Sequence, residues 1–122
     1  MEIRQLRKKL TEFVEERDWQ KFHTPKDLAL AISIESGELS ELFLWKTLEE
    51  SRVKLADDIF FHAILDEISD IMIYCLNMTN ACESLSGKKI DIGEAITKKI
   101  EKNANKYPVA LYKSKARLEK PE

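Results

Sequence analysis

Residues 64–73 read ILDEISDIMI and place two acids three residues apart, Glu67 and Asp70, inside a largely apolar segment. Apolar side chains continue on both sides of this stretch at intervals of about 3.5 residues, which is the period of an α-helix. They cover more than one face, so the pattern predicts a central helix over residues 60–84. The same segment therefore decides the fold and raises the first question about function.

A second apolar segment, residues 28–43, holds another pair of acids three residues apart, Glu35 and Glu38. Residues 28–34 are apolar nearly all round, so we expect them to be buried on most sides. Side chains at positions i and i+3 lie on one helical face, so each pair directs its carboxylates to one side. If the two helices pack together, four carboxylates meet in a partly buried place, where repulsion and desolvation are costly. Shared protons, basic partners or metal ions would each offset this cost, and the residues alone leave the three open.

The available donors narrow the choice of metal. Carboxylate oxygens suit Mg²⁺, with Mn²⁺ as the alternative. The two histidines, His23 and His62, do not complete the Glu-x-x-His motif of di-iron bundles. Histidine and cysteine ligands are also too few for a zinc site.

The composition predicts an all-α fold. The chain has 122 residues, enough for one domain, with only three glycines and three prolines to form turns. Residues 46–58 are polar and are expected to hold a loop with a short helix. We divide the chain into a domain over residues 1–112 and a charged tail over residues 113–122. The four main helices are predicted over residues 2–16, 25–45, 60–84 and 91–106.

Charge is unevenly distributed along the chain. Residues 27–70 hold eleven acids and three bases, a net charge of −8, between ends of +2 and +4. The total of −2 argues against a nucleic-acid partner, which would require a basic excess. No apolar run reaches the length of a membrane span, and the N-terminus does not resemble a signal peptide. We therefore expect no membrane partner.

The cysteines point to the cytoplasm. Cys75 and Cys82 are seven residues apart on one predicted helix, which separates their Cα atoms by roughly 10 Å along the axis. This distance is too long for a disulfide, so we expect two buried, reduced thiols.

The acidic pairs resemble a known motif. Glu35-x-x-Glu38 followed by Glu67-x-x-Asp70 resembles the paired acidic motif of the MazG-like all-α nucleotide pyrophosphohydrolases. The likeness extends over roughly residues 3–112, in order and with matching spacing, so it is more specific than a lone Glu-x-x-Glu motif. It resembles the dCTP pyrophosphatase branch of that family. The further matching segments are residues 13–23, 37–46, 67–74 and 99–108.

The resemblance implies a reaction. A nucleoside triphosphate, with dCTP or a modified dCTP favoured, is hydrolysed to the monophosphate and pyrophosphate in a Mg²⁺-dependent step that cleans the nucleotide pool. The implied metal ligands are Glu35, Glu38, Glu67 and Asp70. Glu38 is also a candidate catalytic residue together with Glu41, which continues the same helical face and could orient the water. The alternative for Glu41 is an exposed acid paired with a lysine. The family also implies a homodimer or homotetramer.

The resemblance also implies a base pocket and a phosphate contact. A pyrimidine ring can stack on an aromatic side chain, and polar side chains can form hydrogen bonds with its edge. Without the resemblance, Trp19 and Trp45 would be interpreted as side chains that fill the core. The implied base contacts are Trp19, Gln20, Lys21, Phe22, His23, Trp45 and Tyr74. The implied phosphate contacts are Lys99 and Asn103.

One position departs from the pattern. The dCTP-specific relatives carry a histidine nine residues before the tryptophan of the connector, and this chain has Leu10 there. The change could relax selection of the base or sugar. Two other functions therefore stay open: a dUTP-type or phosphoribosyl-ATP-type pyrophosphohydrolase of the same superfamily, and a helical interaction module without catalysis.

Overall fold

The computed structural model describes residues 1–115 of the chain. These residues form helices joined by short connections, and this part of the chain contains no strand. The predicted all-α class is therefore confirmed. The chain divides into two compact units, Met1–Lys89 and the residues from Ile90 onward. None of the described helices combines the length and apolarity that a membrane span requires.

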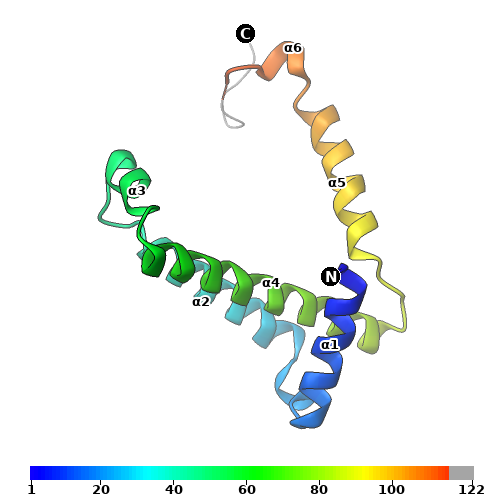
Figure 1. Cartoon of the computed structure of the whole chain (residues 1–122). Coiled ribbons are helices and arrows are strands. Elements are labelled where there is room, and N and C mark those ends of the chain that lie inside the picture. The colour runs from blue at the N-terminus through cyan, green and yellow to red at the C-terminus, as the bar shows by residue number, and fades with distance from the viewer. Residues whose placement is uncertain (116–122) are drawn as a thin grey trace. The chain divides into compact units, whose positions relative to one another are not determined.

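The first unit is built on α2 (Pro25–Glu41) and α4 (Asp58–Ser86), which lie side by side (Figure 1). Local signals set their ends. The Thr24 hydroxyl accepts a hydrogen bond from the backbone N–H of Asp27 at 3.2 Å and caps α2. At its C-terminus α4 ends on Gly87, which adopts a left-handed φ of 71° that glycine tolerates without strain. The predicted central helix is thus confirmed and extends slightly beyond residues 60–84.

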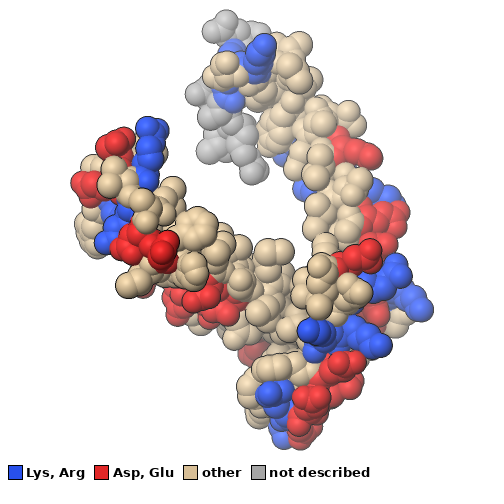
Figure 2. All heavy atoms as spheres, viewed as in Figure 1, with Lys and Arg blue, Asp and Glu red and all other residues tan. Residues whose placement is uncertain are grey.

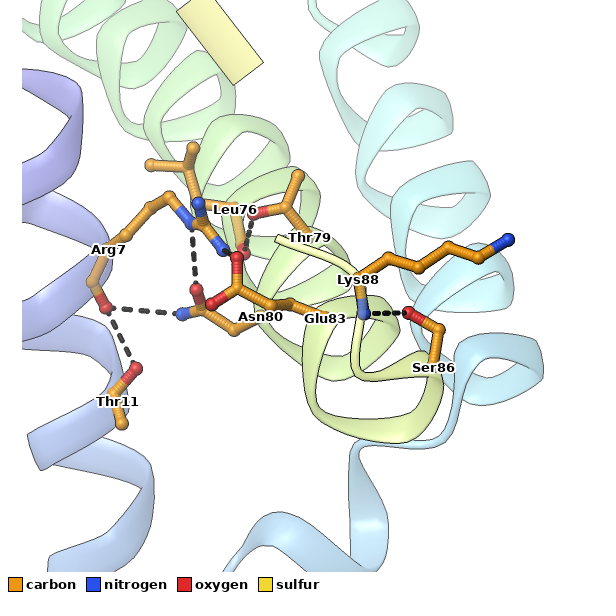
Figure 3. Close-up of polar contacts among 8 residues, drawn as sticks. All are labelled: Arg7, Thr11, Leu76, Thr79, Asn80, Glu83, Ser86 and Lys88. Atoms are coloured by element: carbon orange, nitrogen blue, oxygen red, sulfur yellow. Dashed lines mark hydrogen bonds and ion pairs between the residues drawn. The ribbon is translucent and has the colours of Figure 1, made fainter. Parts of the chain in front are cut away.

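Helix α1 (Ile3–Glu16) packs against α4 through a polar contact that we call the Arg7 clamp. Arg7 Nε donates to Asn80 Oδ1 at 2.8 Å, and Arg7 Nη2 pairs with Glu83 Oε2 at 3.2 Å. Asn80 Nδ2 in turn donates to the Arg7 carbonyl at 3.1 Å (Figure 3). The Arg7 side chain is only 14% exposed, so the contact is shielded from water. The clamp therefore fixes α1 on α4.

The second helix ends earlier than predicted. It was expected to reach residue 45, but α2 stops at Glu41 and residues 42–45 form turns. The backbone N–H of Phe43 bonds the Ser40 carbonyl at 3.1 Å, three residues back, which tightens the chain and ends the helix. This turn brings the Phe43 ring edge-on to Phe60, with ring centroids 5.5 Å apart. Tertiary packing therefore overrides the apolar pattern of the sequence.

Two shorter elements complete the first unit. The connector after α1 contains a 3₁₀-helix, η1 (Gln20–Phe22), and the polar stretch expected to hold a short helix contains α3 (Leu48–Lys54). Thr47 caps α3, since its hydroxyl accepts from the Glu50 N–H at 3.1 Å.

The second unit contains α5 (Ile92–Lys106) and α6 (Val109–Tyr112). Asp91 caps α5 by accepting from the Glu94 N–H at 3.0 Å, which confirms the predicted start. Helix α6 was not predicted. It is a single turn whose Tyr112 ring packs edge-on against Tyr107, with centroids 5.2 Å apart. Most of the tail predicted over residues 113–122 lies outside the described residues.

Burial within the single chain is lower than predicted. Residues 28–34 were expected to be buried on most sides, yet Leu30 is 54% and Ile34 is 62% exposed. One side of α2 packs on α4, and the other side stays uncovered in this chain. Cys75 and Cys82 are both free thiols, but Cys75 is exposed and Cys82 only half-buried, so their predicted burial is wrong here.

Candidate active site

Three carboxylates from α2 and α4 converge on one point. One oxygen each of Glu35, Glu38 and Glu67 lies within 4.8 Å of the other two. The i, i+3 spacing places the α2 pair on one face, and the packing of α4 against that face supplies the third acid. Figure 2 shows acidic side chains gathered over this pair of helices. We call these three residues the carboxylate group.

Two oxygens of the carboxylate group are buried without a partner. Glu35 Oε2 and Glu67 Oε2 have no hydrogen-bond donor within the described part of the chain. Ionised carboxylates only accept hydrogen bonds, so the three acids cannot satisfy one another unless one of them holds a proton. Desolvated carboxylates in this state require a proton or a cation.

The pKa values follow from this geometry. Burial, a shared proton with Glu38 and repulsion by the Glu38 charge raise the pKa of Glu35 from 4.5 to about 7. Burial also raises the pKa of Glu67, and the negative charges of Glu38 and Asp70 add to the shift. A hydrogen bond from Glu35 partly offsets this rise in the pKa of Glu67. Near neutral pH the carboxylate group therefore binds a proton readily, and a cation would compete for the same place.

The donor set fits a hard divalent cation. Mg²⁺ and Mn²⁺ prefer carboxylate oxygens, and the two unpartnered oxygens belong to different helices that face one another. Asp70, the fourth predicted ligand, does not belong to the carboxylate group. It lines the adjoining cleft together with Glu35, and its charge contributes to the raised pKa of Glu35.

A cleft of about 440 Å³ adjoins the carboxylate group. It brings the predicted base contacts Trp19, His23 and Tyr74 together with Glu35 and Asp70. The Trp19 ring is held edge-on against Phe13 with centroids 5.8 Å apart. The residues that line the cleft are Leu10, Phe13, Val14, Trp19, His23, Glu35, Asp70, Ile73, Tyr74 and Asn77.

A second cavity of about 350 Å³ shares part of its wall with the cleft. Val14, His23 and Asn77 line both. Two further predicted base contacts, Gln20 and Lys21, line the second cavity. The connector between α1 and α2 therefore contributes to two adjoining hollows.

Several predicted residues lie elsewhere. Trp45 is 89% exposed in the turns after α2, and Phe22 is 61% exposed; neither lines the two cavities. Glu41 is the exposed last residue of α2 and is not one of the carboxylate group. Lys99 and Asn103 lie on α5 in the second unit.

Four residues of the cleft were not predicted as functional candidates. Phe13, Val14 and Ile73 supply apolar walls, and Asn77 supplies an amide. Asn77 follows Tyr74 by three residues and Asp70 by seven, which is the spacing of one helical face. That spacing could have identified it. Leu10, where the family resemblance departs, also lines the cleft, so the departure falls at the candidate site.

Metal affinity is expected to depend on pH. A cation bound by the carboxylate group must displace the proton of Glu35, whose pKa is about 7. Apparent Mg²⁺ affinity should therefore be about tenfold weaker at pH 6 than at pH 8. In the metal-free protein the raised pKa contributes stability below pH 4.5 that is lost as the pH rises through about 7. Titration calorimetry at both pH values checks the affinity, and a pH-independent value would contradict the expectation.

The carboxylates and the aromatic cleft define an all-α protein with a candidate cation site beside a pocket for a planar group. A model of the MazG-like family matches residues 30–117. The chain is 36% identical over 114 residues to dCTP pyrophosphatase 1 of Bos taurus and 35% identical over 115 residues to that of Homo sapiens. These matches cover 93% and 94% of this chain. The chain spans 64% of the length of both relatives.

A solved structure agrees with the sequence comparison. The crystal structure of a pyrophosphatase from Archaeoglobus fulgidus superposes with a TM-score of 0.72 and 39% sequence identity, covering 86% of this chain and 91% of that one. The chain therefore belongs to the MazG-like family.

Proposed function

We propose that this protein is a Mg²⁺-dependent pyrophosphohydrolase of nucleoside triphosphates, with dCTP or a modified dCTP as the preferred substrate. The observation that carries the proposal is the pair of unpartnered, buried oxygens of Glu35 and Glu67 beside a cleft walled by aromatic rings. The similarity to pyrophosphatases supports the same reaction class.

The residues have separate tasks in this proposal. Glu35, Glu38, Glu67 and Asp70 hold the cation. Bound Mg²⁺ would neutralise phosphate charge and lower the pKa of an attacking water. Glu41, one turn beyond Glu38 on α2, is proposed to orient that water.

The base and the phosphates have contacts of their own. Trp19 and Tyr74 offer ring faces to the base, and His23 offers a polar edge. The family resemblance suggests further contacts. We propose that the base is also contacted by Gln20, Lys21, Phe22 and Trp45. We propose that the phosphates are contacted by Lys99 and Asn103.

Pyrophosphate release across a panel of triphosphates with Mg²⁺ tests the proposal. Release from dCTP or 5-substituted dCTP at the highest kcat/KM is expected. A preference for dUTP would favour the dUTP-type alternative and would be explained by Leu10 in the cleft wall. No release from any triphosphate would leave a helical interaction module as the better account.

We also propose that the protein forms a homodimer or homotetramer through the uncovered side of α2. Leu30 and Ile34 are one helical turn apart and both more than half exposed, so together they present an apolar face to a partner. The cytoplasm is the proposed location, because both cysteines are free thiols.

Replacing both Leu30 and Ile34 by Asp should convert the oligomer to a monomer. Two charges on this face would have to be desolvated at the interface, which is unfavourable without partners. Light scattering after size-exclusion chromatography measures the mass. Val53→Asp on α3, which is 66% exposed in the wild type, is the matched control and should stay oligomeric. An unchanged mass of the double variant would place the interface elsewhere.

A further inference from the structure

Asn77 is a buried residue of α4 that faces two cavities. It lies on α4 and is only 6% exposed, the one polar residue among the buried residues of the described chain. It lines both the cleft and the second cavity. No hydrogen bond joins its side chain to another residue within residues 1–115. The buried side-chain atoms that lack a partner in the described chain are oxygens of Glu35 and Glu67, so the Asn77 amide opens onto the cavities that it lines.

Asn80, one helical turn further along α4, provides a direct comparison. Its amide is fully engaged in the Arg7 clamp: Nδ2 donates to the Arg7 carbonyl at 3.1 Å, and Oδ1 accepts from Arg7 Nε at 2.8 Å (Figure 3). Asn80 thus has a structural task, which is to hold α1. Asn77 has no such task, although it is the more deeply buried of the two. Its donor and acceptor remain available to a ligand in the cleft.

The position of Asn77 on α4 indicates which part of a ligand it meets. Asp70, Tyr74 and Asn77 line one cleft and follow one another along one helical face. Asp70 and Asn77 are seven residues apart, or roughly 10 Å along the helix axis. A nucleotide with its phosphates at the acids would pass Tyr74 and bring its base toward Asn77.

We propose that Asn77 is a specificity-determining residue whose amide binds the polar edge of the nucleobase. The inference rests on the proposed function, because it assumes that a nucleotide occupies the cleft. An amide offers one donor group and one acceptor group side by side, so it suits a base that presents an acceptor next to a donor. A buried site of this kind rejects ligands that lack the matching edge, because its own polar groups then stay unpaired.

The test compares dCTP with 1,2-dideoxyribose 5-triphosphate, an abasic analogue. Asn77→Leu keeps the approximate volume and removes both hydrogen-bonding groups. We expect kcat/KM for dCTP to fall about tenfold or more, while hydrolysis of the abasic analogue stays nearly unchanged. The melting temperature of the ligand-free variant should stay close to that of the wild type, because no hydrogen bond within the described chain is lost.

Two further variants separate recognition from folding. Asn77→Asp keeps the acceptor and loses the donor, so it should change the ranking of dCTP against dUTP. Asn80→Ala breaks the Arg7 clamp, so it should lower the melting temperature and leave that ranking unchanged.

The outcomes distinguish this inference from the proposed function. If the wild type hydrolyses dCTP and both Asn77 variants rank all substrates as the wild type does, Asn77 does not read the base. The same conclusion follows if the wild type does not discriminate against the abasic analogue. If the wild type hydrolyses no triphosphate, the proposed function fails. Calorimetric binding of dCMP to the wild type and Asn77→Leu then decides the role of Asn77, and equal affinity or no binding overturns it.

Discussion

Glu38→Gln is expected to reduce pyrophosphate release from dCTP by about a hundredfold or more. The substitution keeps the shape of the side chain and removes one of the three charges within 4.8 Å of one another. The affinity for Mg²⁺ should fall with it. Stopped assays of pyrophosphate at saturating Mg²⁺ measure the loss.

The same variant should be at least as stable as the wild type when metal is absent. The charge of Glu38 and its hydrogen bond raise the pKa of Glu35, so its removal relieves repulsion. Mg²⁺ should raise the melting temperature of the wild type but have little effect on Glu38→Gln. Glu12→Gln removes an exposed acid of α1 and is the matched control for loss of charge. Wild-type turnover by Glu38→Gln would show that the carboxylate group is not the site.

Trp19→Ala is expected to raise KM for dCTP by about tenfold to a hundredfold. This is the usual loss of affinity when an aromatic side chain that stacks on a base is replaced by alanine. Trp19 lines the cleft and is 42% exposed, so one part of the ring is held by Phe13 while another is open to a ligand. The value of kcat should change less than KM, because the ring lies beside the base and not at the reacting phosphate. Steady-state kinetics over a range of dCTP concentrations separate the two.

Trp19→Phe is the conservative partner of this variant. It keeps an aromatic face and should retain most of the affinity for dCTP. Because Trp19 also packs on Phe13, melting temperatures of both variants are needed to show that the fold persists. If Trp19→Ala binds dCTP as the wild type does, the ring serves packing alone.

The regular part of the fold could be predicted because local signals agree with the tertiary structure. The apolar period of residues 64–73 predicted α4, and α2 begins at residue 25 as predicted, where Thr24 caps it. The end of α2 could not be predicted in this way. Residues 42–45 continue the apolar pattern, but the packing of Phe43 on Phe60 requires a turn there. Such a contact joins residues that are distant in sequence, and periodicity does not reveal it.

The candidate site was likewise predictable only in part. Acids embedded in apolar helices predicted that four carboxylates would meet if the helices pack together. The structure places one oxygen each of Glu35, Glu38 and Glu67 within 4.8 Å of the others, whereas Asp70 lines the adjoining cleft. Asn77 was not predicted, although its spacing from Asp70 and Tyr74 places it on the same helical face. Its burial and its place in the walls of both cavities depend on the packing of α1 against α4, which spacing does not reveal.

The exposure of the apolar face of α2 could not be predicted from the sequence either. The sequence predicted that residues 28–34 are buried, but within one chain Leu30 and Ile34 face outward. Hydrophobicity indicates that a residue requires a partner surface and does not identify which chain supplies it. The proposed oligomer is the arrangement that would satisfy both the sequence pattern and the observed exposure.

The most direct measurement is product analysis of dCTP hydrolysis by the wild-type protein, with and without Mg²⁺. The account predicts dCMP and pyrophosphate in equal amounts, formed only when the divalent cation is present and lost in Glu38→Gln. Formation of dCDP and phosphate, or equal turnover after chelation of all divalent ions, would contradict it.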